Sequence, residues 1–233
     1  MTPLTLVPDL VEQVYQAILN GICDGSLPPG ERVTQEKLAE RLSVSRQPVL
    51  QAMLLLKRDG LVVDAGAKGV MVSLLTADYI SQVYQVRAVL DGLAAREAAR
   101  RRVDLSLSLL AAGRKAGEGR DVGAMIEADL AFHRAIYAAA GNPLLSQSME
   151  RHWNHIRRVM GAVLQKSASR AALWDEHEAI IAAIASGDDQ RAQQLAISHC
   201  EEAGGNLVSR FKSQTDDTTP LKDDSPETTR RQA

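Results

Sequence analysis

The chain has 233 residues, of which 45% are hydrophobic and only 3% aromatic, and its formal net charge at pH 7 is −2. This length suits one large domain or two small ones. The near-neutral charge excludes a general electrostatic attraction to nucleic acid, so any DNA affinity has to come from a local basic patch. No apolar run reaches the roughly 18 residues of a membrane span. Two distant cysteines and no recognisable signal peptide lead us to expect a cytoplasmic protein.

The N-terminal third begins with an amphipathic helix expected at residues 10–24. Residues 35–58 then predict two short helices joined by a tight turn, the helix-turn-helix that places its second helix in a DNA major groove. In that second helix Val49, Ala52, Met53 and Leu56 follow the spacing of one buried stripe, with Ser45 as the expected N-cap. The same spacing leaves an outward face made of Arg46, Gln47, Leu50, Gln51 and Lys57.

Two short β-branched runs follow the helix-turn-helix, at residues 61–63 and 70–72, with Gly66 and Gly69 between them. They predict a hairpin that packs on the helices as a wing. Three helices and a two-stranded wing make a winged helix-turn-helix domain, for which we expect residues 1–75.

From Thr76 onward the pattern is helical. The expected helices are 77–101, 105–117, 122–140, 143–166, 169–186 and 189–212, with N-caps at Thr76, Asp104, Asp121, Asn142 and Asp188. Short connections between such helices predict an antiparallel all-α bundle over residues 76–212. Residues 213–233 hold almost no apolar side chain and are expected to be disordered. The fold class is therefore mainly α.

One aspartate and three histidines lie on core-facing stripes of these helices. Asp129 and His133 are four residues apart and share a face, while His177 and His199 each stand among apolar residues of another helix. Imidazole and carboxylate together suggest a site for zinc, nickel, iron or manganese. A single histidine of this kind is more often a hydrogen-bonded core residue, and Asp129 with His133 could form only an intrahelical pair.

Arg87 is also expected to point inward, because its helix face is apolar. A buried guanidinium can receive a carboxylate in bidentate fashion. The alternative is an ion pair with Asp91 four residues further along the same helix, and the sequence favours neither.

Residues 8–212 resemble the GntR family of transcription regulators, in particular the FadR subfamily, which joins a winged helix to an all-helical FCD sensing domain. The segments "LPPGERV", "LAERLSVSRQPV", "LLKRDGLV" and "GVMV" match the DNA-binding half in order and spacing. "ADLAFHRAIYAAAGNPLL", "EHEAIIAAIASGD" and the late His199 match the sensing half.

The resemblance implies a homodimer that binds an inverted repeat in double-stranded DNA and responds to a small carboxylate, an organic or sugar acid. It implies DNA contacts by Arg46 and, in the wing, by Lys68 and Gly69; we add Thr34, Gln47, Leu50 and Gln51. It also implies a divalent metal, foremost zinc, at Asp129, His133, His177 and His199, and effector binding by Arg87. The chain departs from the family pattern at Leu50 and Gln51, where an arginine and a glutamate are usual.

Several interpretations compete with a ligand-responsive transcription regulator, for which a repressor is one form and an activator the other. The winged helix could be a protein-interaction module, and Leu50 could fill a local apolar contact. The metal could itself be the signal, as in a metal sensor. A metalloenzyme is disfavoured, because no further core carboxylate or histidine stands out as a general base.

Overall fold

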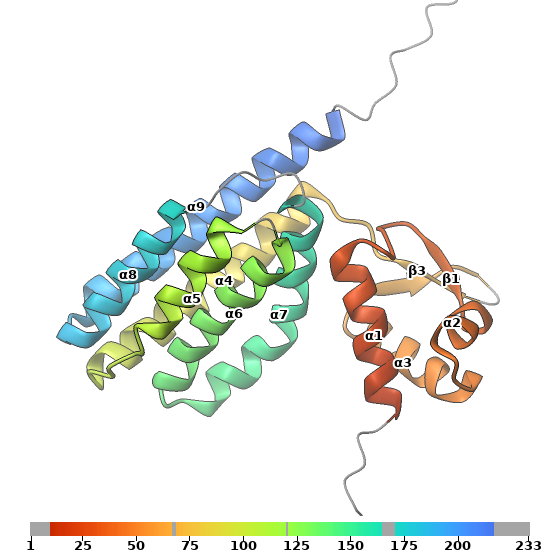
Figure 1. The fold of residues 1–233 in the computed structure, drawn as a ribbon, viewed down its shortest axis with the longest axis horizontal. Coiled ribbons are helices and arrows are strands. Elements are labelled where there is room, and N and C mark those ends of the chain that lie inside the picture. The colour runs from red at the N-terminus through yellow and green to blue at the C-terminus, as the bar shows by residue number, and fades with distance from the viewer. Residues whose placement is uncertain (1–9, 67–68, 120, 165–170, 217–233) are drawn as a thin grey trace, which may run out of the picture.

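The computed structural model describes residues 10–66, 69–119, 121–164 and 171–216. Within these ranges the chain forms two parts, each built around its own hydrophobic core (Figure 1). The N-terminal core runs from Val14 to Val72, and the C-terminal core runs from Leu75 to Leu207. The predicted fold class, mainly α with a winged helix-turn-helix and a helical bundle, is confirmed. Across the described ranges, no helix is both long and apolar enough for a membrane span.

Three helices form most of the N-terminal part: α1 (Leu10–Asp24), α2 (Gln35–Leu42) and α3 (Arg46–Arg58). The Thr34 hydroxyl accepts a hydrogen bond from the backbone N–H of Lys37 at 3.3 Å and so caps α2. Ser43 ends that helix in the left-handed region, with φ at 53°. Ser45 holds the expected N-cap position of α3, although its side chain makes no cap hydrogen bond there. The predicted stripe of α3 is buried.

The wing is a sheet of three strands rather than the predicted two. Strands β1 (Arg32–Thr34), β2 (Val62–Asp64) and β3 (Gly69–Val72) pair antiparallel in the order β1-β3-β2. β1 holds a single apolar residue, Val33, whereas β2 begins with two consecutive valines, so only β2 shows as an apolar run in the sequence. Its Val33 faces Val70 across the pair, and both are buried.

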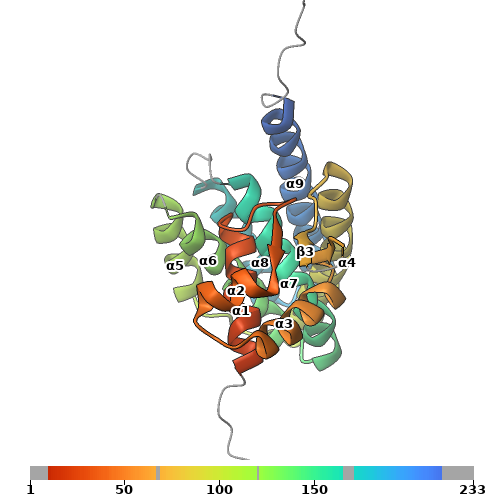
Figure 2. The ribbon, with the colours of Figure 1, turned by 90° about the vertical axis from the view of Figure 1, so that its right-hand side faces the viewer.

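The C-terminal part is a bundle of α4 (Ala77–Arg100), α5 (Ser108–Glu118), α6 (Val122–Ala139), α7 (Pro143–Leu164), α8 (Ala171–Ser186) and α9 (Asp189–Asp216). Helix α4 packs along α9 and also contacts α6, α7 and α8 (Figure 2). Thr76 and Asp121 cap α4 and α6 as predicted, because their side-chain oxygens accept backbone N–H bonds from Tyr79 and Ala124 at 3.1 Å.

Two predicted boundaries in the bundle were wrong. Helix α5 begins at Ser108 with Leu107, not Asp104, in the cap position, because Leu105 enters the core from a non-helical segment. Helix α9 continues past residue 212 to Asp216, and its Gln214 donates to the carbonyl oxygen of Val163 at 3.0 Å. The predicted disorder therefore fails for residues 213–216, and 217–233 lie outside the described residues. So do residues 165–166 and 169–170, the expected ends of two helices.

The two parts meet where α1 packs on α7. The Tyr15 hydroxyl donates to Asp59 Oδ2 at 2.9 Å and accepts from Asn154 Nδ2 at 3.1 Å. Asp59 is the residue that directly follows α3. At Gly161 an added Cβ would lie 1.9 Å from the carbonyl oxygen of Cys23, so the helices approach at backbone distance. The bundle thus contacts the end of α3 through one tyrosine.

Candidate functional site

The outward face of α3 is the candidate DNA-contacting surface. Its Arg46, Gln47, Leu50 and Gln51 are all exposed, as the periodicity predicted. Leu50 has 41% of its surface exposed, so part of its side chain is accessible to another molecule and part packs locally. Leu54, one turn further on, is 57% exposed and was not among the predicted residues. These side chains lie on the helix that a helix-turn-helix inserts into the major groove.

The basic residues of this face are held by acidic neighbours. Arg46 forms an ion pair with Glu36 of α2, and Lys57 lies 2.5 Å from Asp64 of β2. All four side chains are largely exposed to solvent, where such pairs contribute little to stability. A phosphate could therefore replace either carboxylate at low cost.

Thr34 and Gly69 each have a structural role that does not involve DNA. Thr34 caps α2, and an added Cβ at Gly69 would lie only 2.7 Å from the carbonyl oxygen of Val33. Glycine is therefore required at this position for β1 and β3 to pair. Lys68 lies outside the described residues. DNA contact by these three residues stays a prediction.

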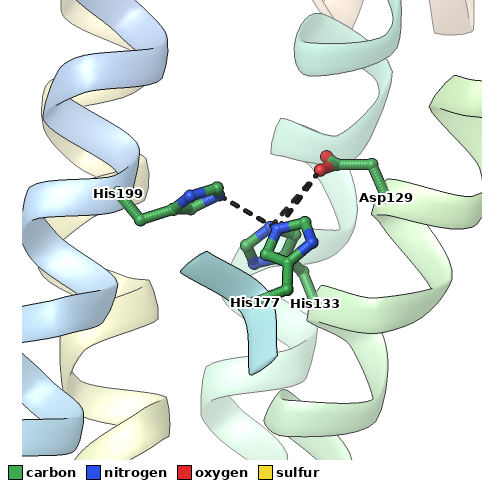
Figure 3. A group of neighbouring side chains, drawn as sticks. All are labelled: Asp129, His133, His177 and His199. Atoms are coloured by element: carbon green, nitrogen blue, oxygen red, sulfur yellow. Dashed lines mark hydrogen bonds and ion pairs between the residues drawn. The ribbon is translucent and has the colours of Figure 1, made fainter. Parts of the chain in front are cut away.

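Four side chains from three helices converge in the bundle. Asp129 and His133 come from α6, His177 from α8 and His199 from α9 (Figure 3). The Nε2 atom of His177 lies 3.2 Å from Nε2 of His199 and 3.6 Å from Oδ1 of Asp129. One ligand atom from each of the four residues lies within 4.8 Å of the others, and all four residues are buried. The sequence-predicted cluster is thus brought together.

The cluster fits a metal ion by its donor set and by an unpaired atom. Neighbouring atoms bound to one ion at about 2.1 Å are roughly 3.0–3.4 Å apart, and the 3.2 Å between Nε2 of His177 and Nε2 of His199 falls in this range. His133 Nε2 is buried without a hydrogen-bond partner and lies 3.8 Å from Asp129 Oδ1. A buried nitrogen left unpaired is costly unless it meets a cation or a donor. The group could therefore hold a metal ion.

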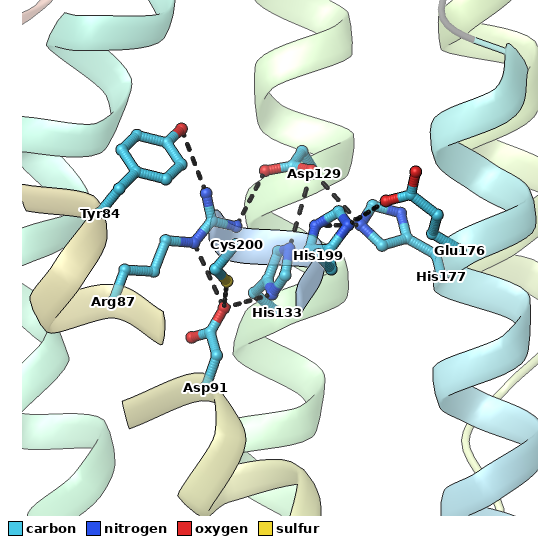
Figure 4. Close-up of polar contacts among 9 residues, drawn as sticks. All are labelled: Tyr84, Arg87, Asp91, Asp129, His133, Glu176, His177, His199 and Cys200. Carbon is cyan, nitrogen blue, oxygen red and sulfur yellow. Dashed lines mark hydrogen bonds and ion pairs between the residues drawn. The ribbon is translucent and has the colours of Figure 1, made fainter. Parts of the chain in front are cut away.

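Two further carboxylates orient the histidines (Figure 4). His133 Nδ1 lies 3.0 Å from Asp91 Oδ2, and His199 Nδ1 lies 2.7 Å from Glu176 Oε2. In such pairs the ring N–H donates to the carboxylate, so the lone pair of the other nitrogen points to the centre. Both carboxylates thus direct Nε2 of their histidines toward the cluster.

Asp91 and Glu176 were not among the site residues predicted from the sequence. Asp91 is a further core carboxylate beside the site, 3% exposed and paired with Arg87 and His133. Its spacing from Arg87 was the available signal, but it indicated only an intrahelical pair. Glu176 directly precedes His177, and adjacent helical residues do not share a face, so spacing gave no signal.

Burial and neighbouring groups together set the protonation states of the cluster residues. Burial lowers the pKa of His133, helped by Arg87, and lowers that of His177, helped by His199 and His133. Burial raises the pKa of Asp91 and Asp129, but the neighbouring His133 ring and the Arg87 guanidinium outweigh it and hold both below their ordinary value. Neutral imidazole and ionised carboxylate are the forms that bind metals.

Cys200 does not add a thiolate ligand to this group. Burial raises the pKa of its thiol well above the ordinary value, and the nearby Asp91 charge adds to the effect. Its Sγ donates instead to Asp91 Oδ2 at 3.0 Å.

Arg87 lies beside the cluster and forms the predicted ion pair with Asp91, while its binding of an effector stays a prediction. It is buried and points inward, with Nη2 at 3.4 Å from Asp129 Oδ2, and its Nε lies 3.3 Å from Asp91 Oδ2. It also lines a cavity of about 250 Å³ that reaches the cluster at Asp129 and His199. The other polar side chains of the lining are Tyr84, Glu176, Asn206 and Arg210. A small molecule in this cavity would therefore touch both the guanidinium and the cluster.

Comparison with known families matches both halves of the chain. A family model described as "Bacterial regulatory proteins, gntR family" matches residues 10–72, and one described as "FCD domain" matches residues 82–202. The first match covers the helix-turn-helix and wing, and the second covers all four residues of the cluster.

Individual relatives agree with these matches. The chain is 27% identical over 195 residues to an uncharacterised HTH-type transcriptional regulator, YdhC, of Bacillus subtilis, an alignment covering 80% of this chain and 86% of that protein. It is 28% identical to a probable D-xylose utilization operon transcriptional repressor of Paenarthrobacter nicotinovorans, covering 82% and 85%. The solved structure of E. coli McbR/YncC matches with a TM-score of 0.76 at 20% identity, covering 88% and 100%, which supports the fold alone.

Proposed function

This chain belongs to the GntR family of bacterial regulatory proteins and carries an FCD domain, and from that premise we propose that it is a metal-dependent, carboxylate-responsive repressor. Its relatives are transcriptional regulators and not enzymes. We assign DNA binding to residues 1–75 and sensing to residues 76–212, in the cytoplasm.

The proposed DNA target is an inverted repeat bound by a homodimer. The exposed basic and amide groups of α3 support contact with a major groove. One copy presents one recognition helix, and a two-fold dimer presents two to successive grooves. Repression, rather than activation, is proposed because one of the relatives is described as a repressor.

The proposed metal ligands are Asp129, His133, His177 and His199. Zinc suits three imidazoles and one carboxylate, and nickel, manganese and iron accept the same donors. The observation that carries the proposal is the buried convergence of these four groups, two of them, His133 and His177, with a buried ring nitrogen that has no hydrogen-bond partner. A bound divalent ion would supply a positive charge and open coordination positions for an anionic oxygen.

The proposed effector is a small organic or sugar acid. The cavity beside the cluster is small, and Arg87 offers it a guanidinium whose present hydrogen bonds are long, at 3.3–3.4 Å. A carboxylate at the metal could take these donors over in bidentate fashion. Asn206 and Arg210 also line the cavity and offer polar groups to the rest of the molecule.

Helix α7 connects the bundle to the N-terminal part through side-chain contacts with both α6 and α1. Glu127 of α6, two residues from Asp129, pairs with Arg157 of α7 at 3.0 Å, and Arg157 donates to Asn20 of α1 at 3.2 Å. The contact from Asn154 through Tyr15 reaches Asp59, at the end of α3. A shift of α6 on effector binding would thus bias where the recognition helix lies.

The test uses the zinc-loaded full chain and a duplex selected from random DNA. A panel of small hydroxy, dicarboxylic and sugar acids is added, and DNA release is followed by fluorescence anisotropy. We expect at least one acid to release the DNA and to be recovered unchanged. His177→Ala should keep DNA binding but lose the response, whereas His152→Ala, outside the cluster, should keep both.

Two other outcomes would contradict the proposal. If chelation alone releases the DNA and no acid has an effect, the ion itself is the signal. If no duplex is enriched by the chain, the DNA-binding assignment fails.

A further inference from the structure

The recognition helix carries an apolar row on its outward face. Arg46, Leu50 and Leu54 are spaced four residues apart and so lie along one line of α3. Both leucines are exposed, by 41% and 57%. Two neighbouring large apolar side chains on a helix surface indicate a contact with another molecule.

A second row runs beside the first. Gln47 and Gln51 are four residues apart and both exposed. A glutamine amide donates and accepts at once, which matches N6 and N7 of adenine in the major groove. A leucine offers only van der Waals contact, which matches the C5-methyl group of thymine. An A·T pair presents the adenine N6 and N7 and the thymine C5-methyl group in the same major groove.

The charges around the two rows favour DNA over an apolar protein partner. Arg46 precedes the leucines, and Lys57 and Arg58 follow them on the same exposed side. The sequence holds no acidic residue between Arg41 and Arg58. A hollow of about 520 Å³ between α3 and the wing is lined by Arg46, Leu50, Leu54 and Lys57, and also by Glu36 and Asp64, the exposed carboxylates that DNA phosphates would replace. An apolar strip between cations fits base edges between phosphates.

We infer that Leu50, with Leu54 beside it, is a specificity-determining residue that contacts the methyl group of a thymine in the operator. Gln47 or Gln51 contacts the adenine of the same or the adjacent pair. The half-site therefore contains an A·T pair opposite Leu50. The inference rests on the DNA-binding part of the proposed function and does not depend on the effector.

The experiment removes single methyl groups from DNA. Duplexes are enriched from a random library with the full chain, and each thymine of the selected half-site is replaced in turn by deoxyuridine. We expect one position at which binding weakens about fourfold, the effect of one buried methyl group. Leu50→Ala should bind the thymine and deoxyuridine duplexes equally. Leu144→Ala is the matched control, since Leu144 of α7 is 67% exposed in the other half.

Each remaining outcome overturns the inference. Equal affinity of the unchanged chain for all deoxyuridine duplexes shows that no methyl group is read, although DNA binding stands. Undiminished methyl dependence in Leu50→Ala assigns the contact to another residue. Failure to enrich any duplex removes the proposed DNA binding together with the inference.

Discussion

Each half of the chain holds an arginine against carboxylates, but in opposite surroundings. In the N-terminal half, Arg46 pairs with Glu36, and the two side chains are 66% and 71% exposed. In the bundle, Arg87 lies between Asp91 and Asp129, and all three side chains are at most 5% exposed. Water and salt screen the first pair, so exchanging its partner costs little. The second group is buried, so removing one partner leaves an uncompensated buried charge.

This difference in burial matches the two proposed tasks. A surface that must exchange a carboxylate for DNA phosphate benefits from weak pairing at Arg46. A sensor that must hold a cation benefits from preorganised groups, as at His133 and His199 with their carboxylate partners. Each change described next alters either the buried cluster with Arg87 or the exposed pair of Arg46 and Glu36.

The largest effect is expected from Arg87→Met in chelator-treated protein. Asp91 and Asp129 would lose their buried cation, so the free energy of unfolding should fall by about 3–5 kcal/mol. Urea unfolding followed by circular dichroism measures the change. The matched variant, Arg46→Met, should change it by no more than about 0.5 kcal/mol. Equal effects of the two substitutions would refute the comparison.

Metal loading is expected to stabilise the bundle. Zinc at a hundredfold or greater excess over its Kd should raise the free energy of unfolding by about 2–4 kcal/mol. Thermal unfolding with and without zinc, together with metal analysis of the protein, tests this. His177→Ala should abolish the increase, and His152→Ala should retain it. A full increase in His177→Ala would exclude that residue as a ligand.

On the exposed side, Arg46→Ala should weaken binding to the selected duplex by about 1–3 kcal/mol. The loss reflects one DNA contact by the guanidinium, and the fold should be unaffected because the side chain is exposed. Titration of labelled duplex measures the affinity. An unchanged Kd would show that Arg46 does not contact DNA.

The smallest effect is expected from Glu36→Gln. This change removes the carboxylate that competes with DNA for Arg46, so binding should strengthen, by no more than about 1 kcal/mol. Titrations at low and high salt test it, since the gain should shrink as salt screens the original pair. Weaker binding at low salt would show that Glu36 positions Arg46 instead of competing for it.

The helices and the four cluster residues could be predicted because their signals are local. A cap such as Thr76 acts within one turn of its helix, and the core-facing stripes of His177 and His199 show in the spacing of apolar residues. The buried stripe and the exposed face of α3 follow from the same periodicity.

The contacts between residues of different helices and strands were decided only by tertiary packing. The pairing of β1 with β3, the carboxylates Asp91 and Glu176 behind their histidines, and the ion pair of Arg46 with Glu36 each join residues of different elements. No sequence period relates such residues, because their distance depends on how whole helices and strands pack. The sequence by itself therefore determined the elements and the faces they bury. Packing decided which buried groups meet and which exposed charges pair.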